Sequence, residues 1–552
     1  MRWQGSWSSL LVVLVTVSGV RAQDSTRSLD PDAWQQDVRV ITEELPRRHP
    51  NLFYRMTRAA WDSAGAAIER RLPTMNRDQT ITALMEWVAL VQDGHTTINP
   101  MFDRALGARY YPVDFFLFED GLFVRAAAPK YERWVGARVL RVGRAGADDA
   151  LARVARTIPA ENEWWRRAWA PQWLAVPEVV DGVGLADDPD RLTLTVERDG
   201  KPETLTLEPA GRIEPHGHNP MASIDRSGWV DMRGPGAAPL WLRNPGRPYW
   251  MEYVAGDRTL YACDRAVVDA EQPPSNGEFW KQVFAFADSA GVDRLIIDLR
   301  ENVGGNSFLN REVVRGIVAH PAVDRPGHLF VIIGRKTFSA AMNLVLDLEQ
   351  WTRATFVGEP TGNATVFFGD HDPLVLPRSG ISVNVSTLPW YPYDPRDRRP
   401  FVAPSVYAPL TSAQYRANVD PAMQAILDRA SKRDWVESVE AAVALGDTAA
   451  AARTIEQAKL DVANRFRNVE SDVNELGYSL LRAKRTAAAV AVLGLDAQAY
   501  PASANAWDSL GEALLAADRR EESIAAYRRA LGIDPGLRTS REALARLGFP
   551  AP

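Results

Sequence analysis

The sequence predicts an α/β protein with a helical region before its α/β core and a helical repeat region after it. From about residue 225 to 430, apolar strand-like runs alternate with helical patterns, which is typical of a parallel sheet covered by helices. Residues 30–95 repeat apolar positions at spacings of three and four, and about 120 final residues show the same spacing and are rich in Ala, Leu, Glu and Arg. The 552 residues suffice for three or four domains.

Residues 1–22 have the features of a secretory signal peptide. Arg2 precedes an apolar run from Leu10 to Val17, and a small-residue cleavage site ends at Ala22. This run is too short to span a membrane comfortably, and no later run reaches the ~20 apolar residues of a transmembrane helix. We therefore expect an exported protein, periplasmic or extracellular, without an integral membrane span after cleavage. An uncleaved anchor is the alternative.

Composition argues against several classes of function. The net charge is −6, so no basic surface favours binding of nucleic acid. The single cysteine, Cys263, cannot form an internal disulfide, and its strand-like apolar context predicts a buried, inert thiol. His216 and His218 lie close together, but no Cys or His cluster with ligand spacing completes a metal site. We expect neither a metal nor a cofactor.

A β-rich module is expected at residues 108–224, after an N-terminal helical region at residues 23–107. In this module YYPVDFFLFEDGLFVRAA indicates two strands, and GARVLRVG indicates a strand before a short helix. Alternation on both sides of an Asp-Gly pair in RLTLTVERDGKPETLTLEP predicts a hairpin.

Three tryptophans in the same module, Trp165, Trp169 and Trp173, have helical spacing. Pro171 is expected to interrupt this helix, because proline lacks a backbone N–H. The tryptophans are interpreted as core residues or, alternatively, as a wall that contacts a peptide.

Residues 225–431 are expected to form the α/β core, with strands at RLIIDLR, HLFVIIG, ATFVGEP and ISVNVS. Ser339 lies at the strand-to-helix corner after HLFVIIG. A serine there is usually a helix N-cap, but the position also suits a nucleophile. The pair Gly304 and Gly305 follows RLIIDLR and lets a backbone N–H approach a ligand, and the amide of Ala340 lies at a helix N-terminus. Two such donors can hold an oxyanion.

Residues 432–552 contain two segments that match at a shift of 34 residues. The glycines in these segments permit close helix packing, and the prolines end each unit. The segments resemble the tetratricopeptide repeat, a helix-turn-helix unit of that length. Such repeats either offer a concave surface to a protein partner or only stiffen the enzyme. The matching pairs are Leu476 with Leu510, Gly477 with Gly511, Leu480 with Leu514, Leu493 with Tyr527, and Pro501 with Pro535.

Five ordered motifs carry a resemblance to a known family: RLIIDLRENVGG, KTFSAAMN, FVGEPTGN, FVAPSVYAPLT and DPAMQAIL. Together they resemble the catalytic domain of the tail-specific, or C-terminal-processing, serine peptidases. DGHT at residues 93–96 is similar to the histidine motif of the tricorn-like branch. The resemblance implies a crotonase-like α/β core and a PDZ-like module, here in degenerate form between GLFVRAA and GARVLRVG.

The resemblance makes Ser339 the nucleophile and Ala340, with either Gly304 or Gly305, the oxyanion donors. A nucleophilic serine needs a base. The lysine that often follows the GEPT-like motif in this family is absent, because Asn363 stands in that region.

His95, in the polar loop VQDGHTTINP, is therefore expected to be the base. Tricorn-like members place a serine just before this histidine, whereas here the residue is Gly94. Lys336, three residues before Ser339, is a rival base if burial lowers its pKa.

An acid is expected to orient the base. The resemblance places it just upstream of FVAPSV, where Asp397 is the first choice and Asp394 the second. The neighbouring Trp390, Tyr391 and Tyr393 are expected to line a hydrophobic substrate pocket.

The sequence thus predicts an exported serine peptidase that cleaves peptides or unfolded segments in a groove between the N-terminal regions and the core. The alternative is a catalytically decayed, exported binding or scaffold protein that uses the groove and the repeats. A third hypothesis is an esterase acting through the same serine, although no Gly-x-Ser-x-Gly elbow is present.

Overall fold

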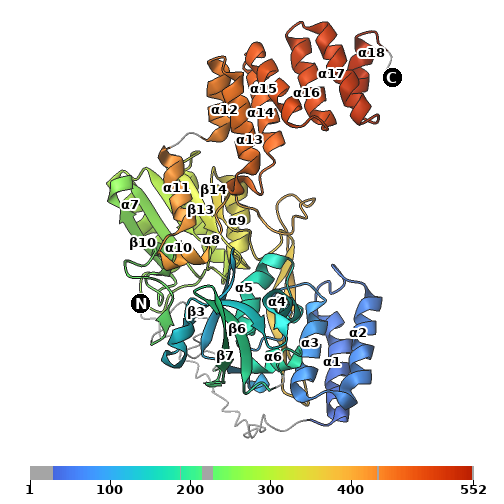
Figure 1. The fold of residues 1–552 in the computed structure, drawn as a ribbon, viewed down its shortest axis with the longest axis vertical. Coiled ribbons are helices and arrows are strands. Elements are labelled where there is room, and N and C mark those ends of the chain that lie inside the picture. Colours follow the sequence, from blue (N-terminus) through green and yellow to red (C-terminus); the bar gives the residue numbers. More distant parts are fainter. Residues whose placement is uncertain (1–28, 187, 214–227, 432–433, 550–552) are drawn as a thin grey trace, which may run out of the picture.

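The computed structural model describes residues 29–186, 188–213, 228–431 and 434–549. The expected signal peptide, and His216 with His218, lie outside these residues. Within the described ranges, no helix has the length and apolar character needed to cross a membrane. The chain forms a mixed α/β body followed by a separate array of helices at the C-terminal end (Figure 1).

The N-terminal helices and the first antiparallel sheet share one hydrophobic core, with members from Trp34 to Ile213 and further members at Phe338 and between Leu374 and Val385. The sheet has the order β2-β3-β4-β6-β7, with β5 and β9 paired at its sides, and β1 pairs separately with β8. The helices are α1 (Pro31–Arg48), α2 (Arg58–Arg71), α3 (Arg77–Ala89), α4 (Ala147–Ala155), α5 (Glu163–Trp173) and α6 (Pro177–Gly182). The strands are β1 (Arg109–Tyr110), β2 (Val113–Phe118), β3 (Gly121–Ala127), β4 (Arg138–Val142), β5 (Ala145–Gly146), β6 (Leu192–Arg198), β7 (Lys201–Leu207), β8 (Gly211–Arg212) and β9 (Val230–Asp231).

One local expectation for this region is wrong. Pro171 lies inside α5, which continues to Trp173. The proline lacks only its own N–H donor, the helix ends two residues later, and burial of Trp165 and Trp173 favours the helix. The expected hairpin is confirmed: Asp199 and Gly200, both with positive φ, form the turn between β6 and β7.

The second sheet has the order β10-β11-β12-β13-β14-β17, with β10 antiparallel to β11 and all other neighbours parallel. Helices α7, α8 and α9 cover one face, and α11 covers the other. The strands are β10 (Tyr249–Val254), β11 (Thr259–Asp264), β12 (Arg294–Asp298), β13 (Leu329–Ile333), β14 (Thr355–Gly358) and β17 (Val406–Tyr407). The helices are α7 (Asn276–Ala290), α8 (Asn310–Ala319), α9 (Ala340–Trp351), α10 (Ser412–Arg416) and α11 (Pro421–Ser431). Cys263 on β11 is buried, as expected.

A hairpin of β15 (Phe367–Val375) and β16 (Ser382–Trp390) links the two halves of the body. Its side chains Val383 and Val385 belong to the N-terminal core. Thr97 exchanges two backbone hydrogen bonds with Asn384 of β16, at 3.1 and 2.9 Å. The hairpin therefore fixes the loop after α3, which carries His95, against the α/β core.

The C-terminal array contains the helices labelled from α12 to α18 in Figure 1. At each of two positions a glycine allows a bulky side chain to pack against the helix backbone: a Cβ on Gly477 would lie 2.4 Å from Leu493, and one on Gly511 would lie 2.8 Å from Tyr527. Because these two contacts are related by the 34-residue shift, the second helical pair repeats the packing of the first. The helices are α12 (Trp435–Ala444), α13 (Thr448–Leu460), α14 (Val469–Arg482), α15 (Thr486–Ala499), α16 (Ala504–Ala516), α17 (Arg520–Ile533) and α18 (Arg538–Arg546).

Candidate active site

Ser339 stands at the corner between β13 and α9, but its side chain does not cap the helix. Its backbone has φ +54° and ψ −124°, a region that non-glycine residues rarely adopt. The backbone N–H of Ser339 donates to Asn363 Oδ1 at 2.5 Å, which holds this conformation. A strained residue at a strand-to-helix corner, with its hydroxyl free of the helix, is typical of a functional position.

His95 lies against that hydroxyl. The distance from His95 Nε2 to Ser339 Oγ is 2.9 Å, although the residues are 244 positions apart in the sequence. The imidazole stacks on Phe338 at 4.5 Å between ring centroids, and Phe338 stacks in turn on Trp165 at 3.9 Å. Burial lowers the pKa of His95, although the nearby Asp93 opposes this effect. A neutral imidazole in hydrogen-bond contact with a serine can act as a general base.

Gly94 has a packing reason to be glycine. A Cβ at this position would lie 2.7 Å from the Phe338 ring, and its N–H donates to Glu161 at 3.2 Å. A serine before His95, as in tricorn-like peptidases, would displace Phe338.

The loop after β12 approaches Ser339 closely. A Cβ on Gly304 would lie 2.5 Å from the Ser339 Cβ and 2.9 Å from the Ala340 nitrogen, so only glycine permits this approach. The N–H of Gly304 donates to Asn302 Oδ1 at 2.9 Å and is already used. The N–H groups of Gly305 and Ala340 have no hydrogen-bond partner among the described residues, and Gly305 lines the groove at Ser339.

Asn302 anchors this loop. Its side-chain nitrogen donates to Asp264 at 3.0 Å, its Oδ1 accepts from Gly304, and its carbonyl accepts from Phe338 N at 3.1 Å. Burial raises the pKa of Asp264 to about 8. One fully buried asparagine thereby connects the glycine loop, strand β11 and the segment that carries the serine.

Asp93 lies on the far side of the His95 ring, with its Oδ1 3.9 Å from His95 Nδ1. Its Oδ2 accepts from Thr96 and Ser386 hydroxyls, both at 2.6 Å, and lies 3.1 Å from His49 Nε2. Although burial alone would raise the pKa of Asp93, the hydrogen bond with His49 and the charge of His95 hold it below its usual value. Asp93 is thus a buried carboxylate beside the base.

A second buried carboxylate, Glu161, was not found by sequence reasoning. One ligand atom each of Asp93, His95 and Glu161 lies within 4.8 Å of the others. Glu161 is 8% exposed, and neither its Oε2 nor His95 Nδ1 has a hydrogen-bond partner in the described part of the chain. Burial, with the charge of Asp93, raises the pKa of Glu161 to about 7. The only feature of the sequence that could have pointed to Glu161 is its position in ENEWW, directly before Asn162.

Asn162 explains how Glu161 reaches the site. Its Oδ1 caps α5, and its nitrogen donates to the carbonyls of Thr361, Gly362 and Pro400 at 3.2, 3.0 and 2.7 Å. The start of α5 is therefore fixed to the loop that also supplies Asn363 to the nucleophile.

The acids expected from the sequence have other partners. Asp397 forms an ion pair with Arg399 at 2.8 Å and accepts a hydrogen bond from Thr365 at 3.1 Å. Asp394 forms an ion pair with Arg396 at 3.0 Å. Among the described residues, neither carboxylate has a hydrogen bond or ion pair with His95. The carboxylates near His95 include Asp93 and Glu161, and the charge of Asp370 on β15 also acts to raise the pKa of His95.

The expected aromatic pocket residues also lie apart from the groove. Tyr391 and Tyr393 are 60% and 57% exposed, and Trp390 packs on Phe367. The residues that line the groove at Ser339 do not include any of the three.

The groove at Ser339 has a volume of about 870 Å³. Its apolar wall contains Trp165, Trp169 and Trp173 of α5, together with Phe338. The lining also includes Asp370, His371 and Asp372 of β15, together with Asp103 and Val303. Trp165, Trp169 and Trp173 therefore agree with both interpretations from the sequence: they are buried or half-buried like core residues, and they line the groove.

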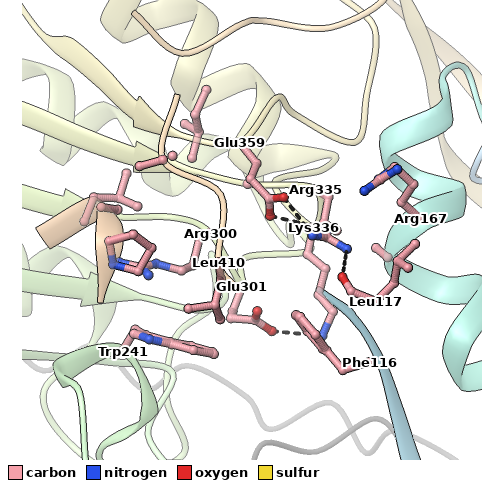
Figure 2. A pocket seen from close by; sticks show the side chains of 18 of the residues that line it. Phe116, Leu117, Arg167, Trp241, Arg300, Glu301, Arg335, Lys336, Glu359 and Leu410 are labelled. Atoms are coloured by element: carbon pink, nitrogen blue, oxygen red, sulfur yellow. Dashed lines mark hydrogen bonds and ion pairs between the residues drawn. The ribbon is translucent and has the colours of Figure 1, made fainter. Parts of the chain in front are cut away.

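Lys336 lines a second, smaller cavity of about 60 Å³, at the carboxyl ends of β13 and β14. Figure 2 shows Lys336 paired with Glu301, at 2.9 Å, and Arg335 held between Glu359 and the carbonyl of Leu117. Lys336 Nζ is bonded to Glu301, and the described residues show no hydrogen bond between Lys336 and Ser339, so this geometry does not support Lys336 as the base.

No protein-family model matches the chain, and no curated protein was found to be similar to it. Among solved structures, mature CPAF complexed with lactacystin aligns with a TM-score of 0.53 and 14% identity, over 72% of this chain and 97% of that chain. A crystal structure of mature CPAF aligns with a TM-score of 0.52 and 14% identity, over 72% of this chain and 96% of that chain. The photosystem II D1 C-terminal processing protease aligns at 14% identity over 73% and 97%, with a TM-score of 0.35, which is too low to support an argument. The similarity to CPAF shows a shared fold.

Proposed function

We propose that this protein is an exported serine peptidase that cleaves peptides or unfolded protein segments through an acyl-enzyme on Ser339. The observation that carries the proposal is the 2.9 Å contact between His95 Nε2 and Ser339 Oγ, next to two unused backbone donors. The shared fold with CPAF and the five motifs support it. Export rests on the signal-peptide pattern of residues 1–22.

In the proposed reaction, His95 Nε2 accepts the Ser339 proton while Oγ attacks the carbonyl carbon of the scissile bond. The N–H groups of Gly305 and Ala340 donate to the oxyanion, and Ala340 adds the positive end of the α9 dipole. Of the two glycines left open by the sequence, Gly305 takes this role because the Gly304 N–H is bonded to Asn302. His95 then protonates the leaving amine, and water hydrolyses the acyl-enzyme.

Asp93 and Glu161 take the role that the sequence assigned to Asp397 or Asp394. When His95 gains a proton, the two carboxylates beside its Nδ1 stabilise the imidazolium. The Asp93 carboxylate already accepts several hydrogen bonds, so the unpaired Oε2 of Glu161 is the atom that can accept from Nδ1–H. We assign Glu161 as the residue that orients the base.

The finer domain assignments belong to the same proposal. The sheet of β10 to β14 with α7 to α9 corresponds to the crotonase-like core, and the sheet of β2 to β7 to the degenerate PDZ-like module. The 34-residue repetition of the contacts at Gly477 and Gly511 supports tetratricopeptide-like repeats in the C-terminal array. In this proposal the repeats bind a protein partner on their concave surface.

Labelling with a fluorophosphonate, followed by assays with denatured protein and with a peptide library, tests this function. We expect covalent labelling of Ser339 and cleavage of peptides, both absent from Ser339→Ala protein. A decayed scaffold protein would bind peptides but take no label. An esterase would hydrolyse small esters at equal concentration while leaving peptides intact.

A further inference from the structure

Behind the His95 ring, away from Ser339, lies a buried group of three potential metal ligands. One ligand atom each from Asp93, His95 and Glu161 lies within 4.8 Å of the other two. Asp93 is 1% and Glu161 8% exposed, and the His95 side chain is 9% exposed. The nearest pair, Nδ1 of His95 and Oδ1 of Asp93, is 3.9 Å apart.

Two of these ligand atoms are buried without a hydrogen-bond partner in the described structure: Nδ1 of His95 and Oε2 of Glu161. A buried polar atom left unpaired costs roughly 1–3 kcal/mol, so such atoms are uncommon. Here two of them belong to residues whose ligand atoms lie within 4.8 Å of each other and of a ligand atom of Asp93. A group that coordinates all three residues would satisfy both atoms at once.

We propose that this triad is a binding site for a divalent transition-metal ion of the zinc class, and that the bound ion inhibits the enzyme. One imidazole nitrogen with two carboxylate oxygens is a donor set that suits Zn²⁺. At usual Zn–N and Zn–O lengths, tetrahedral ligand atoms lie about 3.4 Å apart. The Asp93–His95 separation must shorten by about half an ångström, and the widest one by about 1.4 Å.

The surroundings of Asp93 are those of a supported metal ligand. His49, Thr96 and Ser386 all contact its Oδ2, at 2.6 to 3.1 Å. Such partners fix a carboxylate in place and raise metal affinity. Because Asp93 is held, the adjustment falls on the His95 ring and on Glu161, whose Oε2 is free to turn.

Inhibition follows from the chemistry of imidazole. A neutral imidazole carries one proton, and the nitrogen without it is the base. With a metal ion on Nδ1, the single proton of His95 must stay on Nε2. Nε2 then donates a hydrogen bond to Ser339 Oγ instead of accepting its proton, so Ser339 cannot be activated. Removal of the ion restores the active tautomer without any redox or covalent step.

The groove gives a metal ion access to the site, but a second group of potential metal ligands is exposed in the same groove. His95 lines the 870 Å³ groove, so a turn of its ring opens Nδ1 to solvent. His371, between Asp370 and Asp372 on β15, is exposed in the same groove and also offers metal ligands. The experiment must therefore separate the buried triad from this exposed group.

The binding test uses Ser339→Ala protein, because its zinc affinity can be measured whether or not the proposed peptidase function holds. Isothermal titration with ZnCl₂ is expected to show one saturable site. Glu161→Gln in this background should weaken the affinity at least about tenfold, and His95→Ala should abolish the site. His371→Ala is the matched control and should leave the affinity unchanged. Co²⁺ should give visible d–d absorption in the parent protein and none in the His95→Ala variant.

Absence of a saturable site, unchanged affinity in both Glu161→Gln and His95→Ala, or loss of binding in His371→Ala would overturn the proposal. Thermal melting of each variant confirms that it is folded; if Glu161→Gln is not, the His95→Ala result decides. The inhibitory effect, which rests on the proposed function, is tested separately in the wild-type enzyme. Zn²⁺ should abolish turnover and EDTA should restore it. Turnover insensitive to zinc that saturates the site would refute the inhibition but not the site.

Discussion

The nucleophile and the base of the candidate site are held in contrasting ways. Ser339 is positioned mostly by its own strand–turn–helix unit and by the glycine loop of the neighbouring strand β12, with Asn363 as the main additional support. His95 is positioned by residues from three distant segments: Asp93 contacts His49 and Ser386, and Gly94 contacts Glu161. The position of Ser339, the proposed nucleophile, follows mainly from local structure, whereas the position of His95, the proposed base, follows from the packing of distant segments.

This difference indicates which substitutions should disturb the site. The parallel sheet imposes the geometry at Ser339, because the carboxyl ends of adjacent strands meet at one edge. The geometry at His95 depends on the docking of the N-terminal helices and α5 onto the β15–β16 hairpin. Substitutions that weaken this docking should therefore displace His95, while the backbone conformation of Ser339 is retained.

The largest expected effect comes from removing the two reacting groups. Ser339→Ala and His95→Ala should each lower kcat/KM for peptide cleavage by about 10⁴-fold or more, because they act as one unit. The double variant should be no worse than either single one, which steady-state assays of all three proteins can check. Losses that multiply would show that the two groups act independently, contrary to the 2.9 Å contact.

Glu161→Gln should lower kcat by about 10- to 100-fold with little change in KM, because the base loses an orienting carboxylate while the groove keeps its shape. Asp397→Asn is the matched control, since its carboxylate pairs with Arg399. It should retain at least half of the wild-type kcat. The reverse order of effects would return the orienting role to Asp397.

Gly94→Ala should disturb the base and not the nucleophile. Its Cβ would lie 2.7 Å from the Phe338 ring on which His95 stacks. Relief of this overlap should cost about 1–3 kcal/mol of unfolding free energy and reduce turnover about tenfold. Chemical denaturation and turnover assays measure the two quantities. A fully active, undiminished Gly94→Ala enzyme would contradict the packing role assigned to this glycine.

The smallest expected effect concerns Asp264 on the nucleophile side. Its pKa is raised from an ordinary 3.8 to about 8, so its contribution to stability is fully present below the ordinary value and is lost as the pH rises towards 8. Asp264→Asn removes this titration while keeping an acceptor for Asn302. The melting temperature of the variant relative to wild type should therefore increase between pH 5.5 and pH 8. A difference that is constant over this range would show that Asp264 is ionised in the folded protein.

The elements around Ser339 were predicted from the sequence because their signals are local. A buried strand, a glycine pair and a strand-to-helix corner are each visible in a short window, and the structure places the loop at Gly304 against Ser339 and the Ala340 nitrogen. The hairpin at Asp199 was predicted for the same reason. Pro171 shows the limit of such rules, since burial of neighbouring tryptophans outweighed its local effect.

The assignment of Glu161 as the residue that orients His95 could not be made from the neighbouring sequence. Gly94 and Glu161 are 67 positions apart, and their contact depends on Asn162 fixing α5 to the loop at Thr361. Asp397 has the spacing expected from the motif, but its carboxylate forms an ion pair with Arg399, two residues later.

By itself, the sequence determined the α/β alternation, the repeated helices, the serine at the strand end and the histidine in its polar loop. Only the tertiary structure decided which carboxylates face the base, which glycine keeps a free N–H, and which aromatic side chains line the groove. The physical reason is that backbone elements follow from short-range periodicity, whereas the partners of a buried side chain are chosen when distant segments pack and every buried polar group competes for a partner.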